Sequence, residues 1–322
     1  MNHVRKKNYR TESYTFCLKE DAVIEIRDLV KDYDGNRAVN GLSLTVSRGE
    51  IFSLLGPNGA GKTTTVEIIE GIRGPTSGTV RVLGLDPVVD KSRLVRMVGI
   101  LPQDFNFIEL TTPLEILRFY TSSLKSKLDP LHILSVVDLV DKKDSMFEDM
   151  SGGQKQKLGI AIALCNDPEI LFLDEPTAGL DPVSRRNIWG VIENMKKMGK
   201  TVFLTTHYLD EAEKLADRVA IMKNGVILAE GTPQSLLNMG GSENMLSMDA
   251  DGISISDLRS SGYEATENNG TIEVKLRNPG EFFSIIEYVK SRGAEPRNLF
   301  LKRESLEDVF IKLIGKEEDN ES

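Results

Sequence analysis

Residues 56–63 have the types and spacing of a phosphate-binding loop, because they match the pattern Gly-x-x-x-x-Gly-Lys-Thr. The glycines let the backbone curl so that successive N–H groups face inward around a phosphate, and a helix that begins here adds its positive end. Lys62 can reach the β- and γ-phosphates of a nucleotide, and the hydroxyl of Thr63 can bind Mg²⁺. The predicted nucleotide ligands in this segment are Gly56, Pro57, Asn58, Gly59, Ala60, Gly61, Lys62, Thr63 and Thr64.

Two adjacent carboxylates, Asp174 and Glu175, follow the apolar run at residues 170–173. If that strand neighbours the strand that leads into the phosphate loop, Asp174 would hold Mg²⁺ and Glu175 would polarise an attacking water. Phosphoryl transfer needs this division between a metal that neutralises charge and a group that orients the nucleophile. Alone, the pair could be a solvated strand end and the loop a glycine-rich turn. Together they predict a nucleotide-hydrolysing site.

Strands and helices alternate through the middle of the chain. Apolar runs predict strands at residues 51–55, 170–173, 202–205 and 219–222, and helical patterns predict helices at 63–72, 185–197 and 209–216. This alternation is typical of an α/β fold with a mainly parallel sheet covered on both faces.

Two further parts are expected around this sheet. Short strands at residues 23–27, 42–46 and 79–82, separated by turns such as Asp34-Gly35-Asn36, predict an antiparallel β layer. Helical patterns at residues 113–120, 131–137 and 154–165 predict a helical subdomain, at about 104–168, inserted between two strands of the parallel sheet.

The tetrapeptide Ser151-Gly152-Gly153-Gln154, placed 23 residues before Asp174, resembles the signature sequence of the ATP-binding subunits of ABC transporters. The resemblance covers residues 23–232 closely and implies the P-loop NTPase core of an ABC ATPase. Two departures are mild: Met150 stands where leucine is usual, and Lys157 stands where arginine is common.

Four further residues match motifs of that family. Gln103 resembles the glutamine-loop residue, and Asp181 lies in a D-loop-like segment, Ala178-Gly179-Leu180-Asp181-Pro182. His207 follows a strand, like the switch histidine, and Tyr33 precedes a glycine turn, like the aromatic that stacks on adenine. By themselves, Tyr33 could be a plain strand aromatic, Gln103 a surface-loop glutamine and His207 a buried structural histidine.

The resemblance implies a head-to-tail dimer in which each ATP lies between the phosphate loop of one copy and the signature helix of the other. Ser151, Gly153 and the start of their helix would contact the phosphate across the interface. Asp181 would lie at that interface, and His207 would contact the γ-phosphate. Gln103 would link Mg²⁺ and water to the helical subdomain, so that Thr63, Gln103 and Asp174 form the implied metal site.

The sequence divides into five parts. Residues 1–22 form an expected flexible tail, 23–233 the ATP-binding domain, 234–244 a polar linker, 245–316 a C-terminal accessory domain and 317–322 a frayed end. The order of elements in the accessory domain is βαββαβ, which indicates a small α+β ferredoxin-like unit with a last helix at residues 305–314.

The composition limits the partners. The net charge of −9 argues against nucleic acid, and the absence of an apolar run of about 18 residues argues against a membrane span. The bases near the N-terminus fit a solvated tail better than a membrane contact, and no secretory signal is expected. The two cysteines, Cys17 and Cys165, are far apart and are expected to be reduced.

The predicted function is ATP binding and hydrolysis that energises an ABC transporter through a separate membrane permease. Residues 206–213, near the end of the ATP-binding region, and residues 306–310, in the last helix, resemble the corresponding segments of ABC ATPases that serve exporters of drugs, lipids or polysaccharides. The expected location is cytoplasmic and peripheral on the inner face of the cell membrane. The permease is expected to dock near Gln103, on Phe105, Phe107, Ile108 and Leu110. The alternatives are a soluble ABC-type ATPase that acts on ribosomes or DNA, and an importer subunit.

Overall fold

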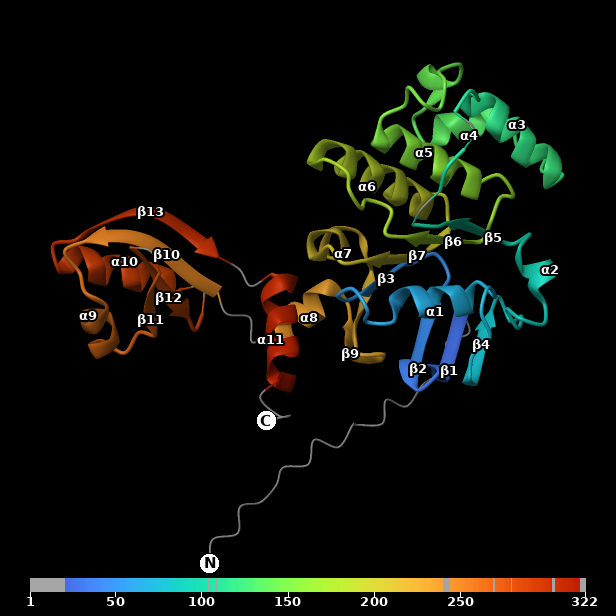
Figure 1. The fold of residues 1–322 in the computed structure, drawn as a ribbon. Coiled ribbons are helices and arrows are strands. Elements are labelled where there is room, and N and C mark those ends of the chain that lie inside the picture. Colours follow the sequence, from blue (N-terminus) through green and yellow to red (C-terminus); the bar gives the residue numbers. More distant parts are fainter. Residues whose placement is uncertain are drawn as a thin grey trace, which may run out of the picture.

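A computed structural model describes residues 21–103, 105–107, 109–239, 244–268, 270–278, 280–302 and 305–318 (Figure 1). Most of the expected N-terminal tail, including Cys17, lies outside these residues, as do Ile108 and the last four residues of the expected frayed end. No helix in the described part of the chain is both long and apolar enough to cross a bilayer.

The centre of the molecule is a six-stranded sheet of order β5-β6-β7-β3-β8-β9. All neighbouring strands are parallel except the edge pair β8 and β9, so the prediction of a mainly parallel sheet is confirmed. The strands are β3 (Ile51–Leu55), β5 (Val98–Leu101), β6 (Ile170–Asp174), β7 (Thr201–Thr206), β8 (Arg218–Lys223) and β9 (Val226–Gly231). The sequence patterns missed the edge strands β5 and β9, where only part of each strand is buried.

A second sheet, of order β2-β1-β4, forms the predicted antiparallel layer. Its strands are β1 (Ala22–Tyr33), β2 (Asn36–Ser47) and β4 (Ser77–Val82). β1 and β2 are longer than predicted because they form a hairpin around Asp34 and Gly35, both of which have positive φ. The hairpin therefore continues almost to its turn, and it places Tyr33 at the end of β1.

The predicted helical subdomain is present between β5 and β6. It consists of α3 (Pro113–Ser123), α4 (Pro130–Val136), the 3₁₀ turn η1 (Val140–Lys142) and α5 (Gly152–Ala163). Phe105 and Phe107 pack against its core, and Phe107 makes edge contacts with Tyr120 and Phe147 at centroid distances of 6.2 and 5.4 Å. Both phenylalanines are therefore half-buried against this core, and the expectation that they receive the permease stays a prediction. Leu110 remains exposed.

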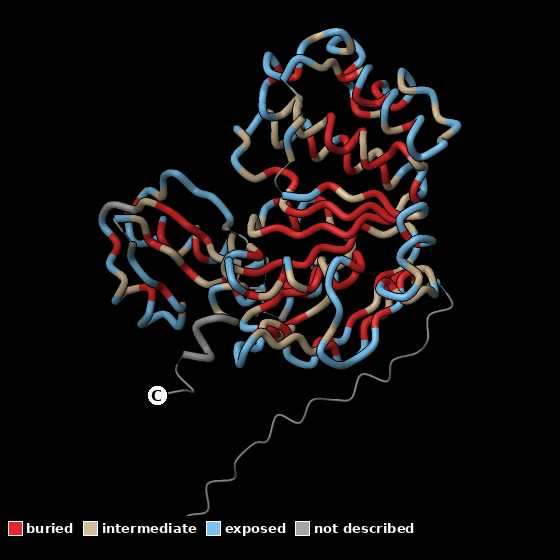
Figure 2. Tube along the Cα trace, turned by 45° about the vertical axis from the view of Figure 1, so that its right-hand side comes forward, coloured by how far each residue is buried: buried red, intermediate tan, exposed pale blue. Residues whose placement is uncertain are grey.

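The central sheet separates two hydrophobic cores (Figure 2). On one face, Leu171 and Val202 pack with the helical subdomain and with α6 (Pro182–Lys197). On the other face, Phe52, Phe172 and Phe203 stack at centroid distances of 5.5 and 5.9 Å beneath the antiparallel layer and α1 (Lys62–Ile69). Because side chains alternate across a strand, β3, β6 and β7 each contribute side chains to both cores.

The C-terminal part forms a four-stranded antiparallel sheet of order β11-β12-β10-β13. Its elements are β10 (Asn244–Asp251), α9 (Ile255–Ser260), β11 (Ala265–Asn268), β12 (Thr271–Leu276), α10 (Glu281–Ser291) and β13 (Glu295–Lys302). This order and pairing confirm the predicted ferredoxin-like topology. The unit has its own core, in which Leu246, Val274 and Ile285 are fully buried.

Two helices tie this unit to the central sheet. α8 (Pro233–Met239) begins the segment that we expected to be a linker, and α11 (Leu306–Glu318) is the predicted last helix. Leu236 of α8 and Leu306 of α11 are buried together against the core under α7 (Leu209–Leu215). Glu213 of α7 also accepts a hydrogen bond from the backbone N–H of Leu306, at 3.4 Å. The last helix therefore packs on the ATP-binding part, beside α8 and α7 (Figure 1).

Candidate functional site

Three neighbouring strands end at one edge of the central sheet and bring the predicted chemical groups together. β3 leads into the phosphate loop, β6 ends at Asp174, and β7 ends one residue before His207. β7 pairs in parallel with both β3 and β6, and its Thr205 lies opposite Asp174. Parallel strands place their carboxyl ends at the same edge, where open α/β sheets bind ligands.

The phosphate loop needs glycine at two positions because neighbouring backbone lies too close for a side chain. A Cβ on Gly56 would lie 2.3 Å from the carbonyl oxygen of Met222, and one on Gly61 would lie 2.3 Å from that of Ala38. Gly61 also has a φ of 102° and precedes α1, which begins without a side-chain cap. The first N–H groups of α1 are thus available to an anion.

Lys62 is buried at the start of α1 and lies among oxygen atoms. Its Nζ donates hydrogen bonds to the carbonyl oxygens of Gly56 (2.7 Å) and Pro57 (3.2 Å), and it lies 3.7 Å from Oε1 of Glu175. Burial lowers the pKa of Lys62, and the negative charges of Glu175 and Asp174 oppose this effect. The partners of the ammonium group are therefore two carbonyl oxygens of its own loop and a carboxylate at 3.7 Å, which a phosphate could replace.

Glu175 lies at the centre of the cluster. Its Oε2 is 3.1 Å from Nδ1 of His207, and it accepts a long hydrogen bond of 3.5 Å from Nε2 of Gln103. Nδ1 of His207 is buried and has no hydrogen-bond partner in the described structure, despite this short distance. Four predicted catalytic residues, Lys62, Gln103, Glu175 and His207, are thus brought together, with one polar atom left unpaired for a further ligand.

Thr205 bonds the side chain of Asp174 and the backbone of Glu175, and the sequence analysis did not identify it. Its hydroxyl donates a hydrogen bond to Oδ1 of Asp174 and accepts one of 3.1 Å from the backbone N–H of Glu175. That N–H also lies 3.1 Å from the carbonyl oxygen of Thr205, and Glu175 has a φ of 47°. The hydroxyl and carbonyl of one strand residue therefore hold Glu175 in a strained conformation at the end of β6.

The predicted metal ligands have the chemistry that a hard divalent cation prefers. Thr63, Gln103 and Asp174 offer hydroxyl, amide and carboxylate oxygens. Burial raises the pKa of Asp174, and the hydrogen bond from Thr205 opposes this effect. The described residues contain no cluster of three His, Cys, Asp or Glu side chains that could hold a metal. The donor set therefore fits a cation such as Mg²⁺ that also takes oxygens from a nucleotide.

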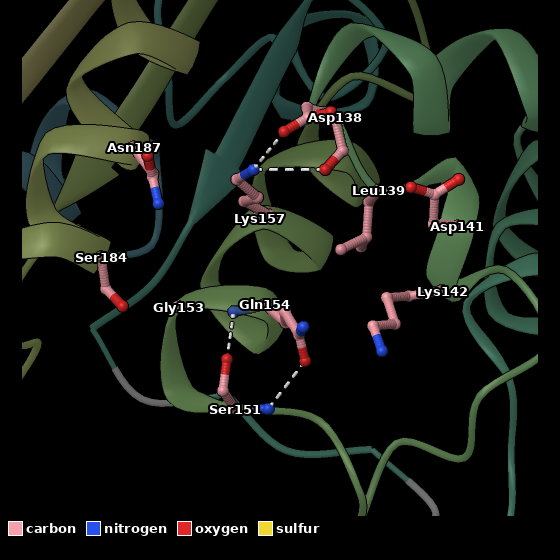
Figure 3. Close-up of a pocket in the computed structure, with 10 residues that line it drawn as sticks. All are labelled: Asp138, Leu139, Asp141, Lys142, Ser151, Gly153, Gln154, Lys157, Ser184 and Asn187. Atoms are coloured by element: carbon pink, nitrogen blue, oxygen red, sulfur yellow. Dashed lines mark hydrogen bonds and ion pairs between the residues drawn. The ribbon is translucent and has the colours of Figure 1, made fainter.

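The signature residues lie at the start of α5, apart from the cluster around Lys62 and Glu175. Ser151 caps α5: its Oγ accepts from the N–H of Gln154 at 3.3 Å, and the side chain of Gln154 accepts from the N–H of Ser151 at 2.9 Å. Figure 3 shows this helix end beside a cavity of about 280 Å³ that also touches Ser184 of α6. No hydrogen bond or ion pair found among the described residues joins it to Lys62 or Glu175.

Asp181 and Tyr33 lie outside the central cluster. Asp181 caps α6 by accepting hydrogen bonds from the N–H groups of Val183 (2.9 Å) and Ser184 (3.0 Å), and hydrogen bonds from Ser184 lower its pKa. The Tyr33 ring is half-buried, with Nζ of Lys31 at 4.9 Å and the guanidinium of Arg73 at 5.7 Å from its centroid. Tyr33 therefore offers an aromatic surface at the end of β1, as the prediction of base stacking requires.

Known proteins with similar sequences are ATP-binding proteins of transporters. The ABC transporter family matches residues 39–178. The chain is 37% identical to the Nod factor export ATP-binding protein I of Rhizobium meliloti, covering 93% of this chain and 90% of that protein. The protein of the same name from Paraburkholderia xenovorans is also 37% identical, over 92% of this chain and 98% of that protein.

Solved structures of ATP-binding subunits of transporters are also similar to this chain. The structure of cbiO1 from Clostridium perfringens, part of the ABC transporter complex cbiONQ, is similar with a TM-score of 0.63 and 30% identity, over 68% of this chain and 92% of that one. A dimeric ATP-binding cassette in a post-hydrolysis state, bound to ADP and Pi, is similar with a TM-score of 0.58 and 27% identity, over 65% of this chain and 98% of that one. The predicted fold class is confirmed.

Glu70 is a second residue that the sequence analysis missed. It follows the last turn of α1 and is 7% exposed. Burial, followed by the charges of Asp174 and Glu67, raises its pKa to about 8. No sequence pattern marks such a residue, because its environment is created by the packing of α1 beside β6.

The raised pKa of Glu70 predicts a pH-dependent stability. Between about pH 4.5 and pH 8 the folded chain keeps a proton that the unfolded chain has released, so stability falls as the pH rises. The glutamine side chain in Glu70→Gln cannot ionise, so the variant does not lose this stability as the pH rises. We expect the variant to gain stability over the wild type as the pH rises from 5 to 9, on the order of 1.4 kcal/mol for each unit of pKa difference.

The measurement is urea unfolding of both chains at several pH values. The exposed Glu109→Gln is the control and should follow the wild type at every pH. If the free energy of unfolding changes with pH by the same amount in the wild type and in Glu70→Gln, Glu70 is not held neutral by the fold.

Proposed function

The chain belongs to the ABC transporter family of ATP-binding proteins, and on this basis we propose that it hydrolyses ATP to drive export through a separate membrane permease. The cluster of Lys62, Glu175 and His207 carries this proposal, because it combines a phosphate-binding cation, a carboxylate base and an imidazole nitrogen 3.1 Å from that base. The described part of the chain has no helix that could cross a bilayer, which fits a permease on another polypeptide.

In the proposed mechanism, Lys62 exchanges its bonds to Gly56 and Pro57 for the β- and γ-phosphates of ATP. Glu175 orients the attacking water and accepts its proton, and loss of the Lys62 contact leaves its carboxylate available for that role. Nδ1 of His207 lies beside the same carboxylate and, once protonated, can donate to the γ-phosphate or to the water.

We also propose that Mg²⁺ binds with ATP. Thr63, Asp174 and Gln103 would hold the ion, which would neutralise charge on the phosphate oxygens. Asp174 suits this role because Thr205 already fixes one of its oxygens through a hydrogen bond. Gln103 suits it because its amide lies at the end of β5, between Glu175 and the helical subdomain.

The separate position of the signature residues supports a head-to-tail dimer. Ser151 and Gly153, at the N-terminus of α5, would contact the phosphates of an ATP held by Lys62 of a second copy or of a homologous subunit. The adenine would stack on Tyr33, and Asp181 would lie at the interface, where it fixes the start of α6. ATP would then hold the two subunits together, and hydrolysis would release them.

The proposed location is cytoplasmic and peripheral, on the inner face of the cell membrane, where the permease would be reached. The helical subdomain and the loop that leads into it carry two strongly exposed apolar side chains, Leu110 (71% exposed) and Phe119 (67%). Such side chains suit the docking of a partner. Export is proposed because the full-length relatives are named export proteins and cover the C-terminal unit as well.

We propose the division into an ATP-binding domain at 23–233 and an accessory domain at 245–316, and we propose that the accessory domain stabilises or regulates the dimer. The packing of Leu306 of α11 against the core under α7 supports this role, because α7 follows the switch histidine directly. The last helix crosses the proposed boundary, since it contacts the ATP-binding part.

Glu175→Gln should trap an ATP-bound dimer. Glutamine keeps the shape of the side chain but cannot accept a proton, so phosphate release should fall by about 100- to 10,000-fold while ATP still binds. The dimer should appear on size-exclusion chromatography only when MgATP is present. Lys62→Ala is the control and should neither bind ATP nor dimerise. Rapid hydrolysis by Glu175→Gln would exclude Glu175 as the base.

The permease interaction is tested by pull-down from membranes in mild detergent. The tagged chain should recover one multi-span membrane protein in stoichiometric amount, and Phe119→Glu should lose it because a charge would enter an apolar contact. Phe283→Glu is the matched control, since Phe283 is 68% exposed on α10 of the C-terminal unit. Recovery of ribosomes or DNA in place of a membrane protein would contradict the proposed transport function.

A further inference from the structure

Unpaired buried polar atoms gather beside the proposed hydrolytic site. Five buried side-chain nitrogen or oxygen atoms in the described structure have no hydrogen-bond partner. Three of them are Nε of Arg185 on α6, Nδ1 of His207 just before α7, and Oε2 of Glu211 on α7. Buried polar groups are costly when unpaired, so their concentration here needs a reason other than packing.

Glu211 is the most deeply buried of these groups. It lies in the first turn of α7 with no exposed surface. Its Oε1 accepts a hydrogen bond of 2.8 Å from the hydroxyl of Thr177 and one of 3.0 Å from Nε1 of Trp189. A leucine would pack a helix at lower cost than a buried carboxyl group. Unlike leucine, Glu211 accepts two hydrogen bonds at one oxygen atom, Oε1.

Those two bonds connect the segments that carry the catalytic groups. Thr177 lies two residues after Glu175, and Glu211 lies four residues after His207 on the helix that this histidine precedes. Trp189 belongs to α6, whose first residues are fixed by the cap at Asp181. One oxygen of Glu211 therefore joins the ends of β6 and β7 to α6, behind the 3.1 Å contact between Glu175 and His207.

Arg185 makes a second set of contacts between α6 and the segment that follows His207. Its guanidinium lies 4.1 Å from the centroid of the Tyr208 ring and 3.4 Å from the carboxylate of Asp210. The Tyr208 ring lies at a centroid distance of 4.1 Å from the His207 ring. Burial raises the pKa of Glu211, and the nearby side chains of Thr206, Thr177 and Trp189 and the charge of Arg185 oppose this effect. The switch histidine is thus in contact with a chain of side chains that ends on α6.

We propose that Glu211 is a positioning residue for ATP hydrolysis: through Thr177 and Trp189 it sets the separation of Glu175 and His207. This inference rests on the proposed ATPase function of the same site. Glu211 touches neither nucleotide nor water in this account, so its loss changes the rate of the chemical step and leaves ATP binding intact.

Three variants separate positioning from packing. Glu211→Leu has a similar volume but accepts no hydrogen bond, and we expect kcat to fall by about 10- to 100-fold with KM for ATP changed by less than about two-fold. Glu211→Gln keeps an oxygen acceptor and should retain most of the wild-type kcat. Thr177→Val should lower kcat as well, and combining it with Glu211→Leu should add little, because both remove the same connection.

Ile192→Val is the control for packing, because Ile192 is fully buried on α6 but takes no part in the hydrogen bonds. It should lower the melting temperature without changing kcat. If folded Glu211→Leu hydrolyses ATP as fast as the wild type, or if it loses activity only in proportion to its melting temperature, as Ile192→Val would, Glu211 is structural and the proposal is wrong.

Fluorescence tests the same connection without hydrolysis. Trp189 is the only tryptophan of the chain, and its Nε1 donates to Glu211. Its emission should shift in Glu211→Leu and stay near the wild type in Glu211→Gln. MgATP should change the emission of the wild type, and Thr177→Val should reduce this change while ATP still binds. A wild-type chain that binds no ATP would refute the proposed function. Unchanged Trp189 emission in Glu211→Leu would refute the role of Glu211.

Discussion

The ammonium group of Lys62 is the constraint on which the rest of the site depends. It is buried beside the carboxylates of Asp174 and Glu175, and its nearest partners are the carbonyl oxygens of Gly56 and Pro57. Buried charges are tolerated only with opposite charges or hydrogen bonds close by. The parallel order of β6, β7 and β3 meets this need, because it ends three strands at one edge and places both carboxylates within reach of one lysine.

α6 connects the two halves of the proposed composite site. Its first residues lie against the signature helix, since a Cβ on Gly153 would come 2.9 Å from the side chain of Ser184. Its third turn reaches Glu211 through Trp189, behind the hydrolytic cluster. In the proposed dimer, α6 would therefore lie between the two ATP sites, with Asp181 at its start and the hydrogen bond of Trp189 further along. The proposal for Glu211 gives this connection a specific residue.

The chemistry of the site was predictable from sequence where it depends on short local motifs. The phosphate loop, Asp174 and Glu175, and the signature at Ser151 each need fixed residue types at fixed spacing. The strand before Asp174 does not neighbour the phosphate-loop strand, because β7 lies between them, but Glu175 still lies 3.7 Å from Lys62. Thr205, Glu70 and Glu211 were missed because they are ordinary residues whose roles arise only when distant segments pack together. The contact of Phe105 and Phe107 with the core of the helical subdomain was not predicted for the same reason, since it depends on residues distant in sequence.

The central claim is that each ATP lies between Lys62 of one chain and the signature helix of another. Cross-linking tests it directly, with Cys17 and Cys165 replaced by serine in the Glu175→Gln background. One tagged chain carries Asn58→Cys and a second carries Gly152→Cys. The account predicts a disulfide between the two chains that forms with MgATP and not without nucleotide. A chain with both substitutions that cross-links within itself, or no cross-link with MgATP, would contradict the account.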